Sequence, residues 1–194
     1  MKHCRVRPYL SFSQLQAYES NQYVKRYLQG EEFDNKYTRF GKLFHESLIG
    51  ETEDKTIERI KLFLPAYEQR EITIRATVEG IPMLGILDGL DIRGREFGDY
   101  KTGKRWTQAR ADKSEQLTFY WLLLWKKYGW LPERAFIHWI ETTEDEGDVC
   151  FTGHVQMFKT TRTMADMLSL FARIKKAWVG IEVLCNKHLK GLIK

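Results

Sequence analysis

The spacing of apolar residues changes near residue 70, and this change constrains the fold more than any other feature of the chain. Before it, apolar residues three and four positions apart predict helices; after it, they mostly alternate as in strands. The expected N-terminal helices cover about 9–18, 36–49 and 54–64. The expected strands cover 71–78, 83–92, 95–101, 134–141 and 149–158, with an acidic loop at 142–148 and helices at 111–128 and 163–183. This order predicts a mixed α/β domain around one small sheet.

The length of 194 residues and an apolar content of 43% fit a single globular domain. We expect a helical N-terminal region (1–66), a sheet core with one helix (67–160) and a C-terminal helix (161–194). The longest apolar run, 119–125, is much shorter than the roughly 20 residues of a membrane-spanning helix, so no membrane contact is expected. Three widely spaced cysteines favour a reduced, cytoplasmic protein.

The charge balance points weakly toward nucleic acid. Lys and Arg number 31 against 26 Asp and Glu, a formal net charge of +5, and aromatic residues make up 13% of the chain. Cations that track phosphates and rings that stack on bases suit single-stranded nucleic acid. Most of these rings could equally belong to the core.

The segment around Arg93 and Gly94 carries the most informative chemistry. If these two residues form the loop of a hairpin, Asp88 lies directly opposite Asp99, with Cβ atoms about 4.5–5.5 Å apart. Like charges at that distance repel unless a cation lies between them, and carboxylate oxygens are ligands for Mg²⁺ or Mn²⁺. Lys101 projects from the same face as Asp99. The alternative is a solvated hairpin with both aspartates outside, because a shift of one residue exchanges the faces.

Three other polar residues have two interpretations when each is considered alone. Gln116 and Tyr120 share one face of the helix expected after the hairpin, as polar anchors of the core or as substrate contacts. His45 lies on the second helix, where a lone histidine is more often structural than a ligand. The sequence contains no phosphate-binding loop, dinucleotide fingerprint, nucleophile elbow or zinc-ligand spacing.

Taken in order, five segments resemble motifs of the PD-(D/E)XK nuclease superfamily, in particular its RecB-like exonuclease branch. These segments are SFSQLQAYESNQYVKRY, FGKLFHESL, GILDGLD, GDYKTG and EQLTFYWLLL. The resemblance implies a restriction-endonuclease-like α/β core, a small mixed sheet flanked by helices, preceded by an N-terminal helical region. It also favours the functional interpretation of His45, Gln116 and Tyr120.

The same resemblance implies a role for each motif residue. The ligands of one or two Mg²⁺ or Mn²⁺ ions would be His45, Asp88, Asp99 and the backbone carbonyl of Tyr100. Lys101 would position or activate the attacking water. The expected DNA contacts are Gln116, Tyr120, Lys104, Arg105 and Trp106. Trp106 could instead be a packing residue.

This chain lacks cysteines that bind an iron–sulfur cluster in some members of the superfamily. Those relatives place Cys-Pro after the first helix and a cysteine cluster near the C-terminus, whereas this chain has Ser20, Asn21 and only Cys185. A 4Fe–4S cluster needs four thiolates, so none is expected.

The resemblance therefore implies a metal-dependent deoxyribonuclease, an exonuclease acting on single-stranded DNA or DNA ends in repair, recombination or phage DNA metabolism. A helicase or recombination protein is a possible partner. Two alternatives remain open: a structure-specific endonuclease, and a catalytically silent nucleic-acid-binding module on the same fold.

Overall fold

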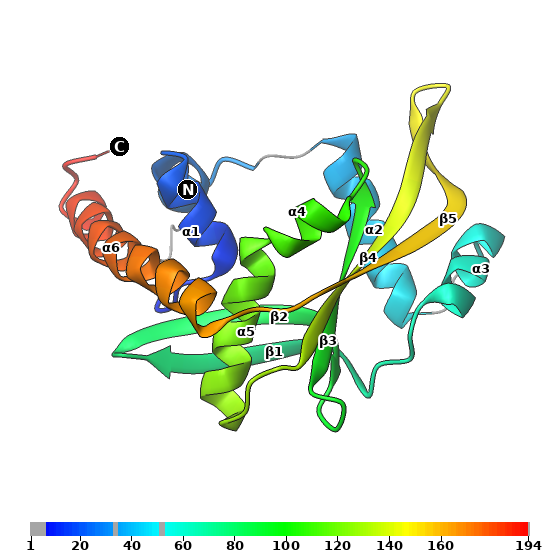
Figure 1. Ribbon diagram of the computed structural model, residues 1–194. Helices are drawn as coiled ribbons and strands as arrows, with labels where there is room; N and C mark the ends of the chain where they lie inside the picture. Colours follow the sequence, from blue (N-terminus) through cyan, green and yellow to red (C-terminus); the bar gives the residue numbers. More distant parts are fainter. Residues whose placement is uncertain (1–6, 33–34, 51–52, 194) are drawn as a thin grey trace.

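A computed structural model describes residues 7–32, 35–50 and 53–193 and contains one sheet with helices on both faces (Figure 1). The elements in chain order are α1 (Phe12–Glu19), the π-helix η1 (Val24–Leu28), α2 (Lys36–Ile49), α3 (Lys55–Phe63), β1 (Gln69–Val78), β2 (Ile81–Asp91), β3 (Glu96–Gly103), α4 (Gln108–Asp112), α5 (Glu115–Tyr128), β4 (Arg134–Asp145), β5 (Asp148–Thr160) and α6 (Met164–Leu189). The predicted mixed α/β architecture is confirmed. No helix in the described part of the chain has the length and apolar character that crossing a bilayer requires.

The five strands lie in sequence order, β1-β2-β3-β4-β5. Every neighbouring pair is antiparallel except β3 and β4, which are parallel and joined by the segment containing α4 and α5. A parallel pair needs such a crossover, whereas antiparallel pairs close with short turns. The sheet is therefore mixed, with the parallel pair at its centre.

Two apolar cores cover the two faces of the sheet. The larger core contains residues of α1, α5 and α6, including Leu15, Trp121 and Ile174. The smaller core is built from α2, α3 and the strand residues that face them, including Phe44 and Ile60. A sheet covered in this way buries side chains of both orientations, so β2 and β3 can place polar groups far from solvent.

Side-chain caps fix where several helices begin. Ser11 and Gln14 form a capping box at α1, and Thr163 with Asp166 forms another at α6. The side chain of Asn35 accepts from the Thr38 amide at the start of α2. These caps satisfy amides that have no partner within their own helix.

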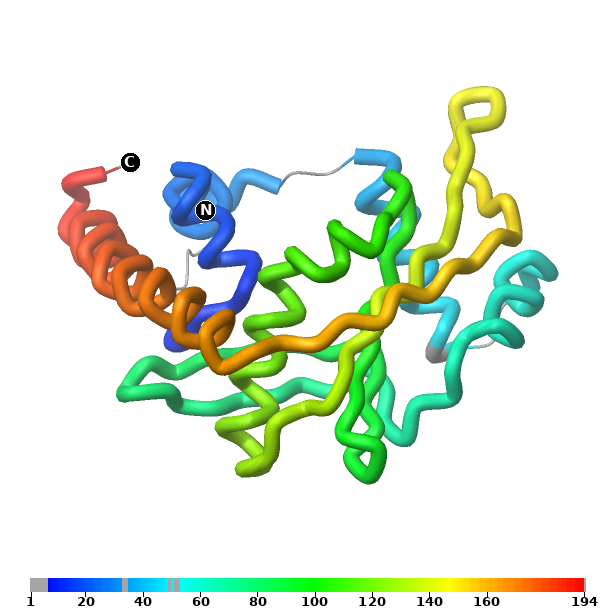
Figure 2. Tube along the Cα trace, in the orientation of Figure 1, coloured from blue at the N-terminus to red at the C-terminus, as the bar shows by residue number. Residues whose placement is uncertain are grey.

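Two predicted boundaries were wrong. The single helix expected at 111–128 is two helices, because α4 ends at Asp112 and α5 begins at Glu115. The acidic loop expected at 142–148 is instead continuous strand on both sides of Glu146-Gly147. Both turn residues have positive φ, +49° and +92°, which matches the twist of a two-residue hairpin. The tip of this hairpin projects beyond the rest of the molecule (Figure 2).

Candidate metal and nucleic-acid site

The candidate site lies where β2 and β3 diverge. These strands pair through Gly89–Gly98, Leu90–Phe97 and Asp91–Glu96, which is the predicted register. The turn between them has four residues, 92–95, and not the expected two. Beyond Gly89, β2 continues its pairing with β1, while β3 pairs with β4. Asp88 and Asp99 are the first residues past the last β2–β3 pair. The carboxylates therefore lie at a fork in the sheet, where β2 and β3 separate and are no longer joined by backbone hydrogen bonds.

Both aspartates are buried. Asp99 is 1% exposed and Asp88 is 9% exposed, and their neighbours Leu90 and Phe97 are fully buried. The alternative of a solvated hairpin is therefore wrong. Leu87 is fully buried as well, because the sheet is covered on both faces.

The environment of Asp88 disfavours its ionised form. One oxygen, Oδ2, accepts a hydrogen bond from the Tyr100 amide at 2.6 Å, so the carboxyl group replaces a missing contact between the diverging strands. Burial and the nearby charge of Asp99 raise the pKa of Asp88 to about 7, and His45 and Lys101 only partly oppose this effect. A cation at the fork would relieve the same repulsion.

Asp99 belongs to a chain of polar side chains that runs from β3 to α5. The Lys101 ammonium lies 2.6 Å from Asp99 Oδ2 and donates to Gln116 Oε1 at 3.0 Å. The Gln116 amide nitrogen donates to Asp99 Oδ1 at 3.2 Å and to the Tyr120 hydroxyl at 2.8 Å. Burial opposes the charge on Lys101, but the ion pair with Asp99 outweighs it and raises the pKa of the lysine. The structure therefore brings together all four of these predicted residues.

His45 reaches the fork from α2. Its Nδ1 lies 3.3 Å from Glu71 Oε1 and 3.7 Å from Asp88 Oδ1. Burial alone would lower the pKa of His45, but the hydrogen bond to Glu71 and the charges of Asp88, Glu71 and Asp99 raise it. The histidine is therefore held among carboxylates.

Glu71 was missed by the sequence analysis. One ligand atom from each of His45, Glu71 and Asp88 lies within 4.8 Å of the other two, which makes these residues a possible metal-binding group. Glu71 has a φ of +48° within β1, so simple strand alternation does not predict where its side chain points. A positive φ next to a cluster of ionisable groups is the structural feature that marks Glu71 as a candidate site residue.

The donor set at the fork fits a hard divalent cation. Carboxylate oxygens suit Mg²⁺ and Mn²⁺, and an imidazole nitrogen beside them is better suited to Mn²⁺ than to Mg²⁺. Asp99 Oδ2 is directed at Lys101 rather than at the His45–Glu71–Asp88 group. The residues therefore fit a metal, with Glu71 added to the ligands that the sequence suggested.

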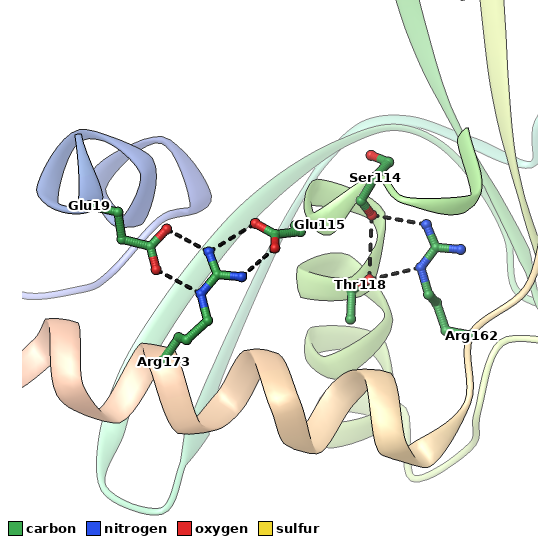
Figure 3. Close-up of polar contacts among 6 residues, drawn as sticks. All are labelled: Glu19, Ser114, Glu115, Thr118, Arg162 and Arg173. Carbon is green, nitrogen blue, oxygen red and sulfur yellow. Dashed lines mark hydrogen bonds and ion pairs between the residues drawn. The ribbon is translucent and has the colours of Figure 1, made fainter. Parts of the chain in front are cut away.

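Two arginines, Arg162 just before α6 and Arg173 within α6, hold the start of α5 (Figure 3). The first turn of α5 carries Gln116. Arg162 donates to Thr118 Oγ1 at 2.8 Å and to the carbonyl oxygens of Ala111 and Ser114, both at 2.9 Å. These bonds add a charged donor to carbonyl oxygens at the break between α4 and α5, which also accept from backbone amides. Arg173 bridges Glu19 of α1 and Glu115 of α5. Both contacts fix α5 relative to the other helices.

We expect Arg162→Ala to lower the free energy of unfolding by about 2 kcal/mol, because it leaves carbonyls at a helix junction without their charged donor. Arg173→Ala is the control; its ion pairs are partly exposed, so its removal should cost about 1 kcal/mol or less. Urea unfolding of both variants measures the difference. Equal losses would contradict the role assigned to Arg162.

The segment after Lys101 forms a basic loop. Lys104 and Arg105 are exposed, whereas Trp106 is only 7% exposed and the Arg110 guanidinium lies 4.0 Å from the centroid of its ring. Arg110 also donates to the carbonyl oxygens of Lys104 and Arg105. Trp106 is therefore placed as a packing residue, which was one of the two interpretations of its role.

A second buried group lies on the opposite face of β3. The Tyr67 hydroxyl and His138 Nε2 are 2.7 Å apart, and burial lowers the pKa of His138 to about 4. No local sequence pattern predicts this pair, because Tyr67 and His138 come together only once β4 pairs with β3. The neutral imidazole is a structural partner of Tyr67.

Comparisons with known proteins show a similarity of the whole fold to solved structures. No protein-family model and no curated protein matches the sequence. The structure is similar to a phage-related exonuclease from Haemophilus somnus, with a TM-score of 0.56 and 14% identity over 93% of this chain and 86% of that one. It is also similar to an alkaline exonuclease from Laribacter hongkongensis, with a TM-score of 0.50 and 12% identity over 94% of each chain. The chain therefore has a fold that exonucleases use.

Proposed function

We propose that the protein is a metal-dependent deoxyribonuclease of the RecB-like branch, an exonuclease that acts on single-stranded DNA or at DNA ends. The observation that carries the proposal is the convergence at one fork of two buried aspartates, a lysine and a histidine. The similarity in fold to exonucleases supports it. We further propose a single cytoplasmic nuclease domain that works in repair, recombination or phage DNA metabolism, with a helicase as a possible partner.

In this proposal Mg²⁺ or Mn²⁺ would be held by His45, Asp88, Asp99 and the Tyr100 carbonyl, with Glu71 as an additional ligand. When bound, the metal would supply charge neutralisation at the phosphate and lower the pKa of a water molecule. The Lys101 ammonium would orient the attacking water and offset negative charge on the phosphate.

Gln116 would keep Lys101 in place. Its side chain contacts Lys101, Asp99 and Tyr120 at once, so it links the lysine to α5. Burial raises the pKa of Tyr120, so its hydroxyl stays protonated and available to a DNA phosphate as a hydrogen-bond donor.

A degradation time course tests the proposal. The substrates are end-labelled linear and circular DNA, single- and double-stranded, with Mg²⁺, Mn²⁺ or EDTA. We expect linear single strands to be degraded with metal and circles to survive. Cleavage of circles would indicate an endonuclease, and binding without cleavage under every metal condition would indicate a silent binding module.

Metal binding should depend on pH. Because the pKa of Asp88 is about 7, its carboxyl group is largely protonated at pH 6 and ionised at pH 8. The raised pKa of His45 acts in the same direction, since a metal needs the neutral imidazole. We therefore expect Mn²⁺ to raise the melting temperature more at pH 8 than at pH 6.

The metal-free protein should show the opposite trend. The folded-state pKa of Asp88 lies above the ordinary value of 3.8, so the free energy of unfolding should fall as pH rises from about 4 to about 7. Differential scanning fluorimetry with and without Mn²⁺ measures both effects. An equal Mn²⁺ shift at the two pH values would contradict the assignment of Asp88 as a ligand.

A further inference from the structure

A cavity of about 660 Å³ lies at the end of β3, the strand that carries Asp99 and Lys101 of the candidate site. We call it the β3-exit groove; its walls are the first turn of α2, the end of β3 with the basic loop after it, and β4. Figure 1 shows the tip of β3 beside the start of α2. Two of these walls belong to elements that carry site residues: α2 carries Tyr37 at this groove and His45 about two turns later, and in β3 Thr102 directly follows Lys101. The groove therefore lies along two elements that also carry residues of the candidate site, α2 and β3.

The groove carries an excess of positive charge on a fixed loop. Its charged lining residues are Lys104, Arg105, Arg110 and one acid, Glu141. Gly103, with a φ of +90°, turns the chain out of β3, and its carbonyl accepts from the Trp139 indole at 3.0 Å. Arg110 is used to hold the loop backbone, and Glu141 accepts from Thr152. Among the described residues, no ion pair or side-chain hydrogen bond involves Lys104 or Arg105, so their charges are available to a ligand.

The opposite wall carries an aromatic ring. Tyr37 is 46% exposed and lines the groove, while its hydroxyl donates to Glu144 of the β4–β5 hairpin. Lys36 contacts the same glutamate and lies 5.5 Å from the centroid of the Tyr37 ring. These contacts hold the ring at the groove. Trp106, by contrast, is buried and has no exposed face of comparable size.

We propose that the β3-exit groove binds the single strand of DNA that passes through the catalytic site, with Tyr37 stacked on one base and Lys104 and Arg105 on its phosphates. An exposed ring facing unpaired cations is the combination that binds single-stranded nucleic acid, because every base has a face for stacking. In a duplex the base faces are already stacked on their neighbours. The inference rests on the proposed nuclease function for its ligand, and it names the form of DNA that the site takes.

The first test measures binding without cleavage. Fluorescence anisotropy in EDTA, with a labelled thymidine oligonucleotide, compares Tyr37→Ala with Tyr37→Phe. We expect Tyr37→Ala to weaken binding about tenfold, whereas Tyr37→Phe keeps the ring and stays close to wild type. An oligonucleotide of abasic sites should bind wild type and Tyr37→Ala equally. Equal losses in both variants would show that Tyr37 only fastens the hairpin and would overturn the stacking role.

The second test addresses the phosphates. Removing two phosphate contacts in Lys104→Ala/Arg105→Ala should reduce the slope of log affinity against log salt by about 1.4. The matched control is Lys126→Ala/Lys127→Ala at the last turn of α5, which should keep the wild-type slope. An unchanged slope in the first variant, or an equal change in the control, would overturn the phosphate role.

A blunt duplex of the same length completes the experiment. The proposal predicts that Tyr37→Ala leaves duplex affinity unchanged, and an equal loss on duplex and single strand would overturn the single-strand assignment. Because all binding is measured in EDTA, failure of the nuclease proposal would appear separately, as absence of cleavage with metal by a protein that still binds.

Discussion

Asp88→Asn is expected to abolish DNA cleavage while making the metal-free protein more stable. The substitution removes a carboxylate that we assign to the metal, so the cleavage rate should fall at least about a hundredfold. The amide oxygen can still accept from the Tyr100 amide, which keeps the local geometry. The substitution also removes a buried carboxyl group whose ionisation is opposed by burial and by the charge of Asp99. At pH 8 we therefore expect the free energy of unfolding to rise by about 2–4 kcal/mol.

Cleavage assays with Mg²⁺ or Mn²⁺, together with urea unfolding in EDTA, measure the two effects. Asp91→Asn is the matched control, since Asp91 lies in the same strand and accepts from the Gly94 amide in the turn. That variant should cleave DNA like wild type. A lower stability of Asp88→Asn at pH 8 would contradict the repulsion that we infer at the fork.

Gly98→Ala is expected to destabilise the fold by about 3 kcal/mol or more. A Cβ atom at Gly98 would lie 2.1 Å from the Tyr67 hydroxyl oxygen and 2.8 Å from His138 Nε2. Tyr67 is buried against the hairpin and His138 is buried in the sheet, so neither can move into solvent. The glycine is therefore required by close packing rather than by its backbone conformation.

A double-mutant cycle tests this explanation. Tyr67→Ala removes the closest obstructing atoms, so Gly98→Ala should cost less in that background than in wild type. Urea unfolding of the two single variants and the double variant gives the coupling energy. Additive losses would show that the clash with Tyr67 is not the cause.

Local sequence signals predicted the elements that make the site. The apolar periodicity placed α2 at 36–49, and the Arg93-Gly94 turn fixed which residues of β2 and β3 face each other. These predictions depend on residues within a few positions of one another. The burial of Asp88 and Asp99 was open in the sequence, because it depends on helices that cover both faces of the sheet.

The features that were missed depend on distant contacts or unusual backbone. Glu71, which joins His45 and Asp88, has a positive φ within β1. His138 meets Tyr67 through a strand pairing across the α4–α5 crossover. The break between α4 and α5 is stabilised by Arg162, which lies far along the sequence. No periodicity within a short window reports such partners.

The mixed sheet also has a consequence for how the protein folds. β1, β2 and β3 follow one another through short turns, so the pairing that brings Asp88 near Asp99 closes only a small loop. β4 joins β3 by closing the much longer loop that contains α4 and α5, and pairings of that kind form slowly. The aspartates should therefore meet early on the folding pathway, while Gln116 arrives in a later step.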